Sequence, residues 1–165
     1  MKPTISNIVK MAEKIIDVKF YLPKSINKGI TGFLFEELGG IKKTSDCLDC
    51  EDGEIKTYPL KKLKCKRKIN NRGNYIPKET VAITMVDSDK IKLEEWCDSR
   101  LFEKIKKVLF IGYEREDDYV IFKYIHLMES TQEKHKELYK TFENDYDLIR
   151  KSYQDNKVTG SIGKL

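Results

Sequence analysis

Two strand-forming segments joined by an acidic turn place the firmest constraint on the fold. Val108–Tyr113 and Tyr119–Leu127 are rich in β-branched and aromatic residues, and Glu114–Asp118 separates them. Such residues favour strands, and a short polar segment between two apolar runs favours a turn. We assign the aromatic side chains of this region to the core, namely Tyr113, Tyr119, Phe122 and Tyr124. The apolar runs are far shorter than the roughly 18 residues that a membrane helix requires, so the chain is not expected to span a membrane.

Helical and strand patterns alternate along the rest of the chain. Apolar residues recur at helical spacing in Ser6–Val18 and again around Ile30–Leu38, where Gly39 and Gly40 end the second helix. Short strands are expected on both sides of an Asp52-Gly53 turn and at Thr80–Met85, and helices at Arg100–Lys107 and Thr131–Asn156. This order predicts an α/β fold with a mixed sheet of about five strands flanked by helices.

Length and composition indicate a single domain. The 165 residues, 39% of them hydrophobic, suffice for one domain with its own core, which we take to span 1–165. Charged residues interrupt the apolar positions of Met1–Val18, so we expect no secretory signal and a cytoplasmic protein. The four cysteines are Cys47, Cys50, Cys65 and Cys97. Because no second close pair completes Cys47 and Cys50, neither zinc nor disulfides are expected.

Positive charge is concentrated in one stretch. Lys56–Lys78 contains nine cations and no acid, whereas the whole chain has a net charge of +5, so the remainder carries 5 − 9 = −4. Such a segment suits an anionic polymer such as nucleic acid, because each neutralised phosphate releases counterions. A solvated lysine-rich loop would have the same composition.

A carboxylate and an amine share one face of a predicted strand. In Glu54-Ile55-Lys56, strand alternation places Glu54 and Lys56 on the same side. If Asp52 and Gly53 form a two-residue turn, Asp49 lies opposite Lys56 and joins them. Two carboxylates and an ammonium suit Mg²⁺-dependent phosphodiester hydrolysis. A longer turn or a bulge would instead select Asp46, and a charged hairpin exposed to solvent would show the same spacing.

Two longer segments resemble the MutH family, which comprises mismatch-repair nicking endonucleases and related GATC-cutting restriction enzymes. One is Lys28–Glu36, with Gly29, Gly32 and Glu36 at the family's spacing, and the other is Gly53–Pro59. Glu79-Thr80 and Lys104–Phe110 also resemble family segments. The resemblance thus extends from about Lys28 to Tyr113.

The resemblance implies a restriction-endonuclease-like core that cuts double-stranded DNA with Mg²⁺. It assigns catalysis to Glu36, Asp49, Glu54 and Lys56, with Asp46 as the rival of Asp49, and metal binding to Asp49 and Glu54. DNA-backbone contacts are expected from Lys104, Lys64, Lys66, Arg67 and Lys68. The competing interpretation is a non-catalytic DNA-binding module of a duplicated restriction enzyme.

Two features depart from the family pattern. The family's first aspartate precedes its glutamate by seven residues, whereas Asp49 precedes Glu54 by five and Asp46 by eight. We favour Asp49, because a change of two residues keeps a side chain on the same face and a change of one does not. The family also continues beyond the last helix into strands that enter the DNA grooves, while this chain stops at Leu165. The resemblance therefore leaves open a fragment, a homodimer or a second domain of the same chain.

Overall fold

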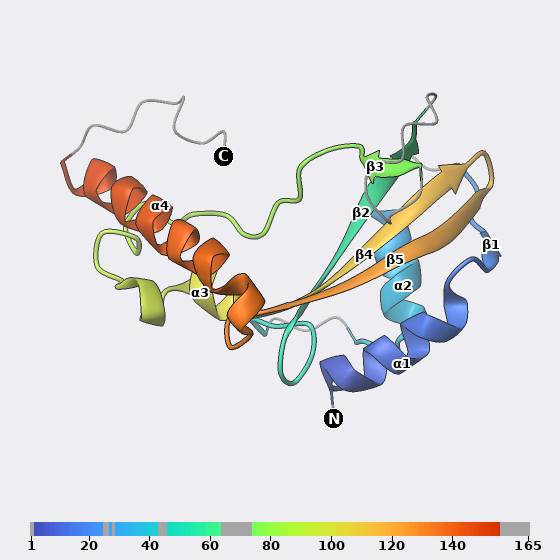
Figure 1. Cartoon of the computed structure of the whole chain (residues 1–165), viewed down its shortest axis with the longest axis horizontal. Coiled ribbons are helices and arrows are strands. Elements are labelled where there is room, and N and C mark those ends of the chain that lie inside the picture. Colours follow the sequence, from blue (N-terminus) through green and yellow to red (C-terminus); the bar gives the residue numbers. More distant parts are fainter. Residues whose placement is uncertain (1, 25–26, 28, 43–45, 64–73, 156–165) are drawn as a thin grey trace.

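The computed structural model describes all residues except 1, 25–26, 28, 43–45, 64–73 and 156–165 (Figure 1). Its centre is a five-stranded mixed sheet, which confirms the predicted fold class. The strands are β1 (Lys19–Tyr21), β2 (Glu54–Lys62), β3 (Tyr75–Pro77), β4 (Lys107–Glu116) and β5 (Tyr119–Glu129), and they lie in the order β1-β5-β4-β2-β3. β2 and β4 are parallel, and the other neighbours are antiparallel.

The β4–β5 hairpin forms where the sequence predicts it. It turns at Asp117, which has a φ of +31°, a region that aspartate adopts more readily than most residues. β4 pairs with β5 on one side and with β2 on the other, so it is the middle strand of the sheet, and four of its residues are buried.

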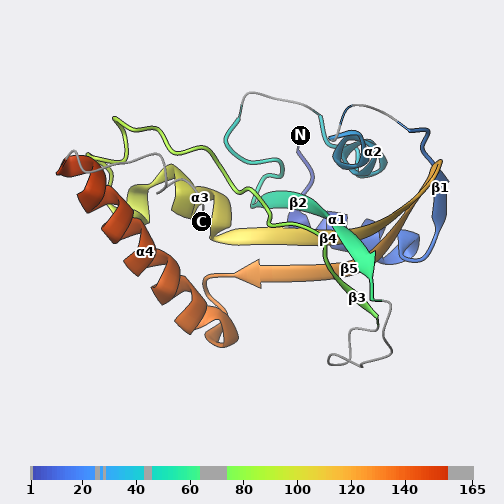
Figure 2. The same cartoon turned by 90° about the horizontal axis from the view of Figure 1, so that it is seen from above.

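Helices build two clusters of buried residues around the sheet. α1 (Ile5–Ile15) and α2 (Ile30–Leu38) pack on one face, where Ile8 and Phe35 meet Leu109 and Phe122. α3 (Arg100–Ile105), α4 (Lys136–Gln154) and the 3₁₀ turns η2 (Trp96–Asp98) and η3 (Glu133–His135) gather at the end where β4 begins and β5 ends (Figure 2). No helix in the described part of the chain is long and apolar enough to cross a membrane.

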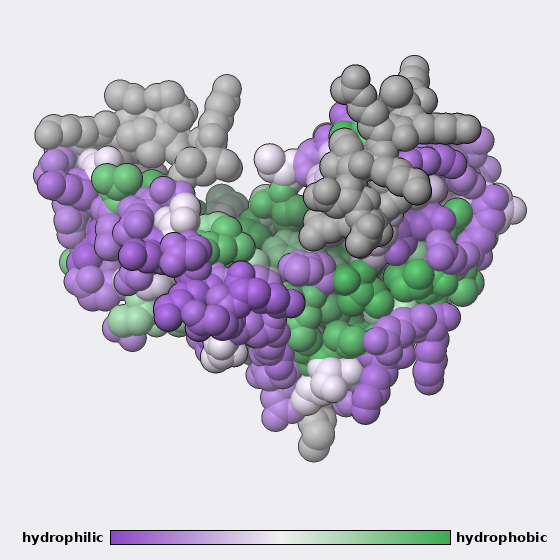
Figure 3. All heavy atoms as spheres, in the orientation of Figure 1, coloured by the Kyte–Doolittle hydropathy of each residue, from purple (hydrophilic) through white to green (hydrophobic). Residues whose placement is uncertain are grey.

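Polar and apolar surfaces are separated on the molecule. Figure 3 shows hydrophilic residues over α4 at one end, whereas apolar surface gathers over the sheet near the middle. That apolar surface is relevant to ligand binding below.

Two of the predicted strands are wrong. The described residues 46–53 form bends rather than a strand, so Glu54 does not begin the second half of a hairpin. Thr80–Met85 is irregular, with Ile83 packed on the second cluster. β-propensity expresses the fit of a side chain to a pleated surface, and neither described segment pairs with a strand of the sheet.

A bulge also changes the expected position of one aromatic residue, Tyr124. Tyr113 pairs with Phe122 but Gly112 pairs with Tyr124, so Lys123 is an extra residue in β5. Phe122 therefore points into the first cluster, as expected, while Tyr124 points to the opposite face. Tyr119 was expected in the core as well, but its side chain is exposed.

Candidate active site

Glu54 is a buried carboxylate that two lysines approach. Its Oε1 lies 2.9 Å from Lys56 Nζ and 2.7 Å from Lys104 Nζ, and the residue is only 1% exposed. Alternation along β2 places Glu54 and Lys56 on the same face, as the sequence predicts. Lys104 comes from α3, whose start is set by Ser99, because the Ser99 hydroxyl accepts from Phe102 N–H. Glu54 and Lys104 are 50 residues apart in the sequence, so only the tertiary structure brings them into contact.

Asp49 joins this group without a hairpin. β3 pairs only with Leu60–Lys62, so the edge of β2 beside Ile55 has no strand partner there. The Asp49 carboxylate occupies that edge, where Oδ2 accepts from Ile55 N–H at 3.0 Å. Burial raises the pKa of Asp49, and the nearby Glu54 raises it further, while the Ile55 hydrogen bond and the charges of Lys56 and Lys104 oppose the change.

Glu36 and Asp46 lie on the other side of Asp49. A small cavity of about 140 Å³ is lined by all three carboxylate residues together with Phe33 and Lys42. Asp46 is largely exposed, with its carboxylate 3.0 Å from Lys2 Nζ. Of the two rivals, Asp49 is therefore the one that neighbours Glu54, and Asp46 lies toward solvent.

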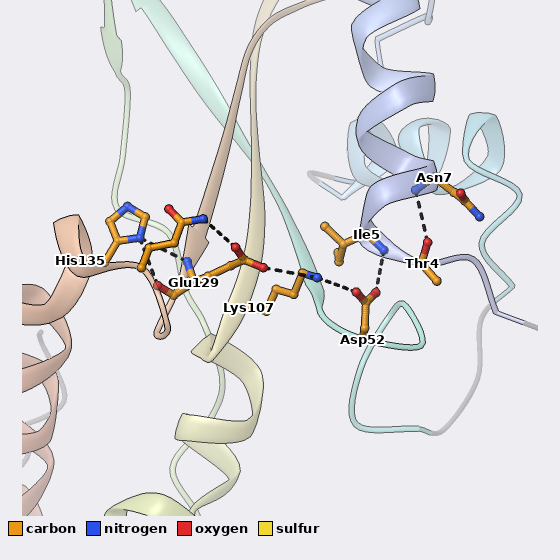
Figure 4. A network of polar contacts seen from close by, with 8 residues as sticks. Thr4, Ile5, Asn7, Asp52, Lys107, Glu129 and His135 are labelled. Carbon is orange, nitrogen blue, oxygen red and sulfur yellow. Dashed lines mark hydrogen bonds and ion pairs between the residues drawn. The ribbon is translucent and has the colours of Figure 1, made fainter.

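A polar network anchors the segment that carries Asp49 (Figure 4). Asp52 Oδ1 accepts from Ile5 N–H at 2.7 Å, at the first turn of α1, and Asp52 Oδ2 lies 2.6 Å from Lys107 Nζ. Lys107 also reaches Glu129, at 3.3 Å. Partial burial by itself would raise the pKa of Asp52, but the hydrogen bonds from Lys107 and Ile5 outweigh this effect and lower the pKa below its ordinary value.

The packing beside this network permits only glycine at position 53. A Cβ on Gly53 would lie 2.7 Å from both Ile5 Cγ1 and the backbone oxygen of Lys107. The sequence suggested Gly53 only as a turn residue, and it did not identify Asp52 or Lys107 as parts of the site. No local pattern marks them, because Asp52 and Lys107 are 55 residues apart.

The lack of a side chain at Gly32 lets α2 lie close to β2. A Cβ there would lie 3.3 Å from Thr57 Oγ1. At Gly29, by contrast, a Cβ would meet the local side chains of Asn27 and Phe33.

Most of the predicted DNA-backbone contacts cannot be placed. Lys64, Lys66, Arg67 and Lys68 lie outside the described residues. Lys61 and Lys62, at the end of β2, are exposed. Lys104 is 12% exposed and directed at Glu54, so any phosphate that it contacts must lie within the site itself.

The donor atoms suit a hard divalent cation that the substrate helps to bind. Glu54 Oε2 is buried and accepts no hydrogen bond from the described residues. Mg²⁺ is commonly held by one or two carboxylates, with water and phosphate oxygens as its other ligands, so Glu54 and Asp49 would suffice. The described residues contain no group of three or more His, Cys, Asp or Glu able to hold a metal ion without help from substrate or water.

Comparison with protein-family models identifies a relationship for this chain. The family model described as DNA mismatch repair enzyme MutH matches residues 39–145, which is well over half of the chain. The matched segment contains Asp46, Asp49, Glu54, Lys56 and Lys104, whereas Glu36 lies just before it. No curated protein matches the chain.

Proposed function

Because this chain belongs to the MutH family of DNA mismatch repair enzymes, we propose that it is a Mg²⁺-dependent endonuclease that hydrolyses a phosphodiester bond in double-stranded DNA. One observation carries the proposal beyond family membership. A buried carboxylate, Glu54, contacts two ammonium groups and has a second carboxylate, Asp49, beside it. This set combines metal-binding oxygens with cations that can stabilise the negative charge of a phosphoryl transition state.

Each side chain has a distinct task in this scheme. A water oxygen attacks phosphorus in line with the bond to the leaving oxygen, which breaks as the new bond forms. The attacking water gives a proton to the surrounding water, and the leaving oxygen takes a proton from it. Lys56, on the face of β2 beside Glu54, orients that water and stabilises charge on the phosphate. Lys104 is positioned to contact the same phosphate, and Glu54 holds both ammonium groups in place. Mg²⁺ held by Asp49 and Glu54 would add charge neutralisation and lower the pKa of the attacking water.

Glu36 takes a supporting role in the proposal. It lies on α2 and lines the small cavity next to Asp49, from which it can hydrogen-bond to water near the reacting phosphate. The recognition site is assigned by resemblance alone, so a GATC-like sequence is the first to test. Cleavage of one strand or both distinguishes the mismatch-repair type from the restriction type.

A plasmid assay tests the proposal directly. Supercoiled DNA containing GATC sites is incubated with the protein and Mg²⁺, with EDTA as the metal-free arm, and any ends are mapped. We expect cleavage with Mg²⁺ only, reduced at least 100-fold in Lys56→Ala and Glu54→Ala, while gel-shift affinity is retained. Glu95→Ala changes an exposed carboxylate outside the site and serves as the matched control. Binding without cleavage under all metals would favour the non-catalytic DNA-binding module.

A further inference from the structure

An aromatic pocket lies on the same face of the sheet as Glu54 and Lys56. The cavity has a volume of about 450 Å³, and its aromatic lining comprises Tyr58, Tyr75, Phe110, Tyr124 and His126. Tyr58, Tyr75 and Tyr124 are half-buried and belong to neither buried cluster. Phe110 packs against the second cluster, but packing of the two clusters does not account for the three tyrosines at this place.

The strand register makes the pocket a direct continuation of the candidate active site. Lys56, Phe110 and His126 form one cross-strand row over β2, β4 and β5. Tyr58, Gly112 and Tyr124 form the next row on that face. Successive rows on one face of a sheet are about 7 Å apart, and this distance equals about two base-stacking steps of 3.4 Å in B-DNA. A nucleotide that flanks a phosphate at Lys56 can therefore reach the rings.

Two local irregularities shape the pocket. Gly112 leaves space for the Tyr58 ring, because a Cβ at Gly112 would lie 3.0 Å from the Tyr58 hydroxyl oxygen. The extra residue Lys123 turns Tyr124 toward this face. A regular β4–β5 pairing would have directed Tyr124 into the core instead.

Ammonium groups surround the aromatic lining. Lys62 Nζ and Lys123 Nζ lie 6.0 Å and 5.7 Å from the centre of the Tyr75 ring, and Lys56 shares a cross-strand row with the lining residues Phe110 and His126. Lys123 also pairs with Asp17, and the Tyr75 hydroxyl donates to Glu114. Aromatic faces bordered by cations bind unstacked nucleotides, since the rings stack on the base and the cations attract the phosphates.

We propose that the enzyme binds one unstacked nucleobase of its DNA substrate in this pocket, next to the phosphate held at Lys56. The inference rests on the proposed function and specifies its substrate further, as DNA from which one base has left the helical stack. Enzymes that extrude a base must overcome its pairing and stacking, a cost that is smallest where the base is already unpaired. The pocket therefore favours DNA with an unpaired base beside the scissile phosphate.

Affinity for two short duplexes tests this inference. Both contain a central GATC site, and one carries in addition a single-base bulge next to it; binding is measured by fluorescence anisotropy with Ca²⁺ in place of Mg²⁺. We expect wild-type protein to bind the bulged duplex at least 10-fold more tightly. Stacking on one aromatic ring corresponds to about 5- to 140-fold in affinity, so Tyr58→Ala and Tyr124→Ala should each lose a factor in this range on the bulged duplex.

Controls separate the pocket from folding and from DNA binding in general. Tyr21→Ala removes an exposed tyrosine of β1 outside the pocket and should behave as wild type. Tyr58→Phe keeps the ring and should retain the preference, and circular dichroism shows whether each variant is folded. Equal wild-type affinity for both duplexes, or an undiminished bulge preference in a folded Tyr58→Ala protein, would overturn the inference. Wild-type binding to neither duplex would instead contradict the proposed function.

Discussion

The contact of two lysines with one buried carboxylate predicts an unusually large stability effect for Glu54→Gln. The substitution keeps the shape of the side chain and removes its charge. Lys56 and Lys104, with side chains 22% and 12% exposed, then lose the anion that lies within 2.9 Å of both ammonium groups. Glutamine cannot compensate the two positive charges, which repel each other.

The magnitude follows from opposing electrostatic contributions. At an effective dielectric constant of about 20, Coulomb attraction over such distances is about 6 kcal/mol per pair. Desolvation of the three ions cancels much of this sum, and each lysine can turn toward solvent once the carboxylate is gone. Removal of one partner from a buried ion pair typically costs about 3–5 kcal/mol, and we expect a loss of that size here. Since domains are stable by about 5–15 kcal/mol in total, the effect should be obvious.

Urea unfolding of the metal-free protein at pH 7 measures the loss. Glu95→Gln is the matched control, because Glu95 pairs with Arg150 at 2.6 Å but is 64% exposed, so solvent screens the pair and its loss should be small. Adding Lys104→Met to Glu54→Gln should recover part of the stability, since one of the two repelling charges is removed. If Glu54→Gln unfolds at the same urea concentration as Glu95→Gln, the buried ion group does not stabilise the fold and the reasoning is wrong.

Three further outcomes are expected. Asp49→Asn should raise the melting temperature of the metal-free protein at pH 7, because a carboxyl whose pKa is raised by folding destabilises the folded state at pH values above its ordinary pKa. The gain in melting temperature should vanish below about pH 3.8, where the carboxyl is protonated in both states, and a gain that persists there would refute this cause. Lys107→Met should increase the Mg²⁺ concentration needed for half-maximal cleavage and leave DNA affinity unchanged, since the loop that carries Asp49 loses its contact with Lys107. Lys107→Arg should restore part of the metal affinity. Equal Mg²⁺ requirements in the wild type and both variants would exclude a role of Lys107 in positioning Asp49. Replacement of the four cations Lys64, Lys66, Arg67 and Lys68 by Gln should flatten the slope of log affinity against log salt by about three to four units if all four contact phosphate. An unchanged slope would mean that other residues bind the DNA backbone.

Local sequence patterns determined much of the architecture. Apolar and β-branched runs located β4 and β5, helical spacing located α1 and α2, and Gly39 and Gly40 ended α2 as expected. These elements follow from interactions between residues close in sequence, such as backbone hydrogen bonds and side-chain alternation. The same alternation placed Glu54 and Lys56 on one face of β2.

Only the tertiary structure decided how the remaining groups reach that face. Asp49 lies beside Glu54 because it caps an open strand edge, not because a hairpin places it there. Lys104 contacts Glu54 at a sequence separation of 50 residues, and Lys107 contacts Asp52 at a separation of 55 residues. The periodic patterns of helices and strands do not predict contacts between residues so far apart in the sequence. The extra residue Lys123 reverses the face of Tyr124, and a bulge is invisible in a sequence whose alternation continues through it. Each of these outcomes depends on contacts between residues far apart in the sequence or on the register of paired strands, and both form only when the chain folds.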